Sequence, residues 1–151
     1  MAVDVGADNI ARARQGYAAF AAGDMTTLAE ILSPDVEWFV GGENVLTGAY
    51  RGRDATFGFF GRLLSITEGT FTVSLRTLAE PEPGLVLALV RLRGQAGTVT
   101  YDEAAVQQVE VHNGLVTSCR TYTENSLRFD ALVGPRVITL PDTEKAQAGS
   151  R

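Results

Sequence analysis

The sequence predicts an α+β fold in which a largely antiparallel sheet packs against N-terminal helices. Apolar residues recur every three or four positions in three segments between Asp8 and Gly69, as on one face of a helix. From Thr70 onward the period changes to two, which is typical of strands. Asn113-Gly114 then predicts a tight hairpin, because a type I′ turn needs two positive φ angles and Asn-Gly tolerates both.

Three helices and one strand are expected in the first half of the chain. Each helix starts at an aspartate that can accept hydrogen bonds from the free N–H groups of the first turn: Asp8, Asp24 and Asp54. The second helix stops at Ser33-Pro34, because the residue before a proline avoids the helical region. The expected elements are helices over residues 8–22, 24–32 and 54–69 and a strand over residues 36–40.

The second half predicts a meander whose last hairpin has a definite register. If Asn113 and Gly114 form a two-residue loop, side chains alternate between two faces of the hairpin. The face expected to line a pocket carries Val106, Gln108, Cys119, Thr121 and Thr123. The opposite face carries three valines that would be costly to leave in water, Val109, Val111 and Val116. We therefore expect a homodimer through this face of the sheet.

Length and composition favour one domain. A chain of 151 residues that is 45% hydrophobic can bury one core but not two. We expect this domain over residues 1–133. Residues 134–151 have little periodicity and end in small and polar side chains, which predicts a mobile tail.

Charge and residue usage argue against several classes of partner. The net charge is −5 and the thirteen basic residues are scattered, so no nucleic acid is expected. Neither an apolar run long enough to span a membrane nor a signal peptide is evident, so we expect a cytoplasmic protein. One cysteine and one histidine are too few ligands for a transition metal. No metal and no cofactor are expected.

Several segments stand in a characteristic order. They are Tyr17–Asp24, Leu28 with Leu32, Asp35–Trp38, Gly48–Ala55 and the hairpin from His112 to Tyr122. Together they resemble the SnoaL-like branch of the nuclear-transport-factor-like superfamily over roughly residues 8–130. The resemblance implies a cone-shaped α+β barrel, with a curved mixed or antiparallel sheet wrapped around the N-terminal helices and an apolar pocket inside.

The resemblance also implies catalytic positions, and most of them are unfilled here. Tyr17 matches the tyrosine of ketosteroid isomerases, but Trp38 stands at their base position and Val106 near their second donor. SnoaL-type cyclases place a histidine near Gln107 and an aspartate near Thr121. In limonene-type epoxide hydrolases, Arg91 could match the arginine, whereas Arg93 and Thr121 replace the two aspartates.

The candidate catalytic residues that remain are Tyr17, Arg91 and Glu124. Tyr17 or Arg91 would stabilise an oxyanion, and Glu124, or else Glu103, would act as a base. For each of them a structural alternative stays open: a core tyrosine, a surface arginine, or a solvated carboxylate at the end of a strand. The expected substrate-binding residues are Trp38, Phe57, Phe60, Val106, Gln108, Cys119, Thr121 and Thr123.

Three functions remain open at this stage. The first is a SnoaL-like protein whose pocket takes a small hydrophobic metabolite, with cofactor-free isomerase or polyketide-cyclase activity. The second is a small-molecule-binding protein without catalysis. The third is a limonene-type epoxide hydrolase with rearranged carboxylates. An ionisable group with a shifted pKa inside the pocket would favour an enzyme over a binding protein.

Overall fold

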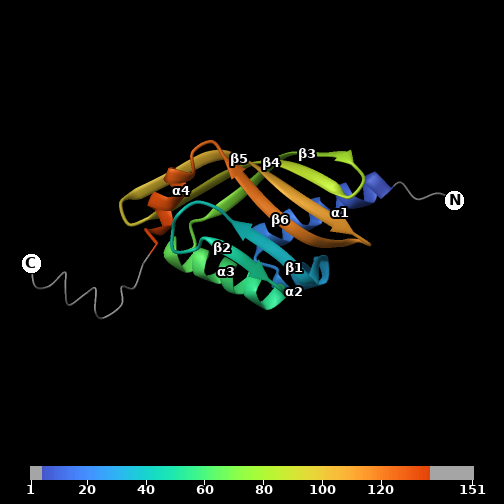
Figure 1. The fold of residues 1–151 in the computed structure, drawn as a ribbon, viewed down its shortest axis with the longest axis horizontal. Coiled ribbons are helices and arrows are strands. Elements are labelled where there is room, and N and C mark those ends of the chain that lie inside the picture. Colours follow the sequence, from blue (N-terminus) through green and yellow to red (C-terminus); the bar gives the residue numbers. More distant parts are fainter. Residues whose placement is uncertain (1–4, 137–151) are drawn as a thin grey trace, which may run out of the picture.

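The computed structural model describes residues 5–136, and it confirms the α+β class (Figure 1). The helices are α1 (Val5–Ala22), α2 (Met25–Ile31), α3 (Arg53–Ile66) and α4 (Ser126–Val133). The strands are β1 (Leu32–Val40), β2 (Gly48–Arg51), β3 (Thr72–Glu82), β4 (Leu85–Ala96), β5 (Val99–His112) and β6 (Leu115–Thr123). None of the helices in the described part is long and apolar enough to cross a membrane.

The strands form one curved sheet in the order β2-β1-β6-β5-β4-β3 (Figure 1). β1 and β6 pair in parallel and all other neighbours are antiparallel, so the sheet is mixed. α1 packs on β3 and α2, while α3 packs on β1 and β2. α4 packs on β4 and β5 at the end of the molecule opposite α2. The sheet therefore wraps around the helices, as expected.

Two of the three predicted helix starts are wrong. Asp24 does cap α2, since its Oδ1 accepts a hydrogen bond from the backbone N–H of Thr27 at 3.0 Å. By contrast, α1 begins at Val5, which places Asp8 inside its first turn. The N-cap of α3 is Gly52, and Asp54 lies in the first turn. A carboxylate one turn into a helix still interacts favourably with the helix dipole, so the two kinds of position have the same sequence signature.

The hairpin turn is confirmed, but its register is wrong. Asn113 and Gly114 have φ angles of 51° and 77°, as a type I′ turn requires. Val111 pairs with Val116, but the next pair is Glu110 with Ser118. Thr117 is therefore an extra residue on β6, and a β-bulge shifts the rest of the pairing by one position.

The bulge turns the β6 side chains from Ser118 onward over relative to Val116, so they share a face with the β5 residues that were expected on the opposite face. Val109 pairs with Cys119, and Gln107 pairs with Thr121 on the concave face. Val106 and Gln108 lie on the outer face instead, opposite Tyr122 and Arg120. The three valines expected on the uncovered face are buried on the concave side: Val109, Val111 and Val116.

The homodimer stays a prediction, but its contact residues would differ from those expected. The outer face of the sheet exposes Leu89 and Tyr122, which are 46% and 52% accessible. Val106 lies between them, because it pairs with both. These side chains, rather than the three valines, are apolar residues of the outer face that a partner could cover.

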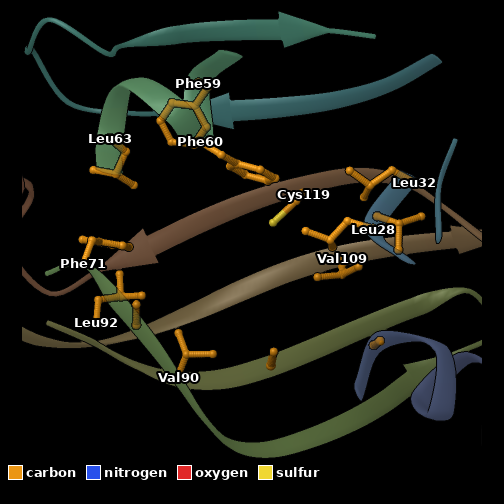
Figure 2. Packing of buried hydrophobic residues seen from close by; sticks show 14 of the residues in the cluster. Leu28, Leu32, Phe59, Phe60, Leu63, Phe71, Val90, Leu92, Val109 and Cys119 are labelled. Carbon is orange, nitrogen blue, oxygen red and sulfur yellow. The ribbon is translucent and has the colours of Figure 1, made fainter. Parts of the chain in front are cut away.

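The core lies between α3 and the concave face of the sheet (Figure 2). Phe59, Phe60 and Leu63 occupy one side of α3 at steps of one, three and four residues, and all three are buried. Phe60 points toward the strand that carries Cys119 (Figure 2). The helix is amphipathic with its aromatic stripe inward, so its position on the sheet is fixed by burial of these rings.

α4 was not expected from the sequence. Hydrogen bonds hold it against the β1–β2 loop. The Asp130 carboxylate accepts hydrogen bonds from the backbone N–H of Glu43 at 3.1 Å and from Nδ2 of Asn44 at 2.7 Å. The carbonyl oxygen of Gly134 accepts one from the backbone N–H of Val45 at 3.2 Å. The predicted tail over residues 134–151 thus begins with an ordered contact, and its part from 137 to 151 lies outside the described residues.

The corrected register predicts unequal effects of the same substitution at neighbouring positions of β5. Val109→Thr places a hydroxyl group on the buried concave face and should lower the free energy of unfolding by about 1–3 kcal/mol. Val106→Thr changes a partly exposed side chain and should change it by less than about 0.5 kcal/mol. Urea unfolding of both variants measures the difference. A larger loss in Val106→Thr would contradict the register.

The contact between α4 and the β1–β2 loop predicts a strong preference for glycine at position 42. Gly42 has a φ of 81°, and a Cβ atom there would overlap the Asp130 carboxylate. Gly42→Ala should therefore cost about 2 kcal/mol of stability from backbone strain and displacement of Asp130. Gly41→Ala is the matched control, since a Cβ there meets no atom within 4 Å. Equal urea midpoints for the two variants would disprove this account.

Candidate functional site

A cavity of about 340 Å³ lies between α1, α3 and the concave face of the sheet. Most of its wall is apolar, with aromatic rings from α1, β1, α3, α4 and the segment before β3. The rings that line it include Phe20, Trp38, Phe59, Phe60, Phe71 and Phe129. Gly41 and Ser126 are exposed members of the lining, and they mark its open end at the β1–β2 loop and α4.

Phe60 is the centre of the aromatic wall. Its ring meets Trp38 edge-on at 5.0 Å between centroids and Phe20 edge-on at 5.2 Å. Phe59 lies 5.7 Å away on the same helix. Edge-to-face pairs of this kind are worth about 0.5–1.5 kcal/mol beyond burial, so the wall has a fixed shape before any molecule enters.

One chain of hydrogen bonds crosses this apolar wall. The Tyr17 hydroxyl on α1 donates to Oε1 of Gln107 on β5 at 2.5 Å. Nε2 of Gln107 donates to Oγ1 of Thr121 on β6 at 3.0 Å. All three residues line the cavity. We call them the polar chain; it joins the first helix to the two strands whose register the bulge sets.

Burial keeps the ionisable groups near the polar chain neutral. The pKa of Tyr17 is raised far above its ordinary value, first because the phenol is buried and second because Cys119 lies close by. Burial also raises the pKa of the Cys119 thiol strongly. At neutral pH, Tyr17 can therefore donate a hydrogen bond but cannot act as a base, and Cys119 is not a thiolate nucleophile.

The structure brings five of the predicted site residues to the cavity wall. They are Tyr17, Trp38, Phe60, Thr121 and Thr123. Phe57 packs behind the wall, with its ring 6.1 Å from that of Phe60. Cys119 is buried in the core without lining the cavity. Val106 and Gln108 lie on the outer face because of the bulge.

Two of the predicted catalytic residues lie away from the cavity. Arg91 is on the outer face of β4, between the inward-facing Val90 and Leu92, and its Nε donates to Oδ1 of Asp102 at 2.6 Å. Arg93 approaches the same oxygen at 3.2 Å. Glu124 follows the end of β6 and is exposed. Neither Arg91 nor Glu124 lines the cavity.

Sequence reasoning missed several residues of the wall. Val109 was assigned to the wrong face, and Gln107, Phe71 and Phe129 were not among the expected substrate-binding residues. A polar residue such as Gln107 at a buried strand position is a usable signal, but only once the register is known. The signal for Phe129 was weak, because α4 is only eight residues long.

Glu103 is the unusual carboxylate of this protein. It lies on the concave face of β5 beneath α4, and its side chain is 0% exposed. Neither of its oxygens has a hydrogen-bond partner among the described residues, and the hydroxyl of the nearby Tyr101 has none either. Nη1 of Arg128 on α4 is 3.8 Å from Oε2, too far for a hydrogen bond.

Glu103 stands close to the cavity without facing it. Its partner across β4 and β5 is Leu92, which lines the cavity. Phe71, Tyr101 and Phe129 pack together between 5.8 and 6.5 Å, and two of these rings form the adjoining cavity wall. Burial, and next the charge of Glu103, raise the pKa of Tyr101.

The cavity wall offers few groups for chemistry. Among the described residues that line it, none carries a carboxylate, imidazole, ammonium or guanidinium group. Within residues 5–136, no three carboxylate, imidazole or thiol side chains lie together as a metal site would require. What the wall does offer is apolar surface and the hydroxyl and amide groups of the polar chain.

Comparisons with known proteins agree with this architecture. Residues 13–119 match the family model of the SnoaL-like domain. The uncharacterised protein Rv0034 of Mycobacterium tuberculosis strain H37Rv is 36% identical over 104 residues, which are 69% of this chain and 79% of that protein.

Two solved structures are also similar. Bal32a, from a soil-derived mobile gene cassette, is 30% identical with a TM-score of 0.84, over 87% of this chain and all of that one. TerC, co-crystallised with polyporic acid, is 20% identical with a TM-score of 0.72, over 83% of this chain and 98% of that one. The likeness to TerC concerns the fold alone. On the family match and the Mycobacterium relative, the chain belongs to the SnoaL-like domain family.

Proposed function

We propose that this protein binds a small hydrophobic molecule in the cavity between α1, α3 and the sheet. The observation that carries the proposal is the composition of the wall: aromatic rings and aliphatic groups surround one short polar chain. Ligand pockets of soluble proteins commonly have this make-up, with apolar surface for affinity and a few polar groups for orientation.

The residues that line the cavity favour ligand binding without acid–base catalysis. A proton abstraction needs a base within hydrogen-bond reach of the substrate. Tyr17 is the ionisable group of the polar chain, and its raised pKa keeps it protonated. No ionised group among the described lining residues could take the proton in its place.

A cofactor-free isomerase or cyclase is the second candidate, and one observation favours it. The Tyr17 hydroxyl is a neutral, buried donor in the cavity, as a group that stabilises an enolate would be. TerC, with a similar fold, was crystallised with polyporic acid, which fits a cavity of this kind for an aromatic molecule. In this case a substrate that enolises readily would be required, because the wall supplies no base.

Epoxide hydrolysis by rearranged carboxylates has less support. It needs two acidic groups that can reach one water molecule and the epoxide. Glu124 is exposed, and Glu103 lies behind the wall under α4. Neither lines the cavity.

A variant whose cavity is filled by a larger side chain should lose ligand binding without losing stability. Gly16 lines the cavity, and a Cβ atom there meets only Cγ2 of Ile31 at 3.8 Å, so a larger side chain would extend into the empty space. Gly16→Leu also removes a glycine from α1, which should favour the helix by about 0.5–1 kcal/mol. Ligands at a hundred times their dissociation constant should stabilise the wild type by about 2.7 kcal/mol and leave Gly16→Leu unshifted.

The measurement is a thermal-shift screen with polycyclic aromatic, steroid and terpenoid compounds. Gly58→Leu is the matched control, because Gly58 lies on the exposed side of α3 with no atom near its Cβ position. That variant should respond to ligands as the wild type does. An equal shift in Gly16→Leu would show that the compounds bind elsewhere.

Removal of the Glu103 carboxylate should stabilise the protein and spare binding. Glu103→Met replaces a buried carboxyl group that has no hydrogen-bond partner among the described residues by an apolar side chain of similar length and should raise the free energy of unfolding by about 1–3 kcal/mol. Glu124→Met, at an exposed carboxylate, should change it by less than about 0.5 kcal/mol. Urea unfolding measures both, and the ligand-induced shift should match the wild type. A destabilised Glu103→Met would mean that hydrogen bonds hold this carboxylate in solution.

A further inference from the structure

The hydrogen-bonding groups of the polar chain determine which kind of ligand oxygen atom can bind beside it. Tyr17 donates to the amide oxygen of Gln107, and the amide nitrogen donates to Thr121. Among the described residues, the Thr121 hydroxyl has no acceptor for its own hydrogen, and the second N–H of Gln107 has none either. Two donor hydrogens of the chain are therefore left without partners at the cavity wall.

This surplus of donors does not depend on how the Gln107 amide is turned. With the amide rotated by 180°, Thr121 would donate to the amide oxygen and the amide nitrogen would donate to Tyr17. The free hydroxyl hydrogen would then belong to Tyr17 instead of Thr121. Both arrangements contain two hydrogen bonds, and each leaves one hydroxyl hydrogen and one N–H unpaired.

A buried donor without an acceptor is costly, whereas an unused lone pair costs less. The chain therefore favours a ligand atom that accepts hydrogen bonds and brings no hydrogen of its own. A carbonyl oxygen meets this requirement, because it has two lone pairs. A hydroxyl group would satisfy one donor and add another.

The wall also disfavours a charged ligand. A carboxylate would be drawn to the donors, but none of the described lining residues has a positive charge to balance it. Transfer of an anion into such surroundings without a counter-charge is strongly unfavourable. The aromatic rings around Phe60 supply apolar surface for a ring system, which packs against aromatic faces and edges.

We propose that the cavity takes neutral, planar ketones or quinones, whose carbonyl oxygen accepts a hydrogen bond from the Tyr17–Gln107–Thr121 chain. This inference rests on the proposed function, since it assigns a ligand class to the same cavity. The chain acts as a donor at either end, and the aromatic wall holds the ring system.

A matched series of fluorene, 9-fluorenone and fluorene-9-carboxylate tests the proposal by isothermal titration of the full chain. One added hydrogen bond should make fluorenone bind about 5- to 10-fold more tightly than fluorene. The carboxylate should bind more weakly than either. The carbonyl stretching band of bound fluorenone should move to lower wavenumber, which reports the hydrogen bond directly.

The control variant is Tyr17→Phe/Gln107→Met/Thr121→Val, which removes all three polar groups at nearly constant shape. It should bind fluorene as the wild type does, lose the preference for fluorenone, and leave the carbonyl band unshifted. If this variant does not fold, Tyr17→Phe/Thr121→Val keeps one amide and should retain at most part of the preference.

The outcomes separate this inference from the proposed function. Equal binding of fluorene and fluorenone to the wild type, or tighter binding of the carboxylate, would overturn the ketone inference and leave the cavity as a binding site. A preference for fluorenone that survives in the triple variant would also overturn it. If neither fluorene nor fluorenone binds to the wild type, the ketone inference fails, and the proposed function fails with it only where the thermal-shift screen also finds no ligand.

Discussion

The β-bulge at Thr117 decides which side chains the cavity receives. Because strand side chains alternate, one extra residue on β6 turns the remainder of β6 over relative to β5. Cys119, Thr121 and Thr123 lie on the concave face together with Val116 only through this shift. The hydrogen bond from Gln107 to Thr121 depends on the same residue, and it extends the polar chain that begins at Tyr17 on α1 to β6.

Burial of aromatic rings fixes the opposite wall of the cavity, which α3 provides. Phe59, Phe60 and Leu63 hold α3 on the sheet, and Phe60 also supports Trp38 and Phe20. Each such ring contributes about 1.5–3 kcal/mol by leaving water, which exceeds the difference of up to about 0.7 kcal/mol in helix propensity that an ordinary residue makes. The wall of the cavity is thus part of the core itself, and its shape is set by the packing that stabilises the fold.

The fold could be predicted from the sequence because its signals are local. The Asn113-Gly114 turn needs no tertiary contact to be recognised, and the change of period near Thr70 marks the boundary between helices and meander. The bulge could not be predicted, because nothing in the residues around Thr117 distinguishes a bulged strand from a regular one. One unseen residue was enough to place Val106 and Gln108 on the wrong face while Cys119, Thr121 and Thr123 stayed on the right one.

Glu103 and the polar chain show two ways in which polar groups are tolerated in this interior. The chain is satisfied from within, since two hydrogen bonds link its three members and only surplus donors remain. Glu103 is not satisfied, and α4 separates it from water while Arg128 stays beyond hydrogen-bond distance. A buried carboxyl group without hydrogen bonds opposes folding, so the remaining contacts of α4 must outweigh it. Asp130 bound to the β1–β2 loop and Leu132 packed in the core supply those contacts. The same helix therefore borders the open end of the cavity and covers the unsatisfied carboxyl group beneath it.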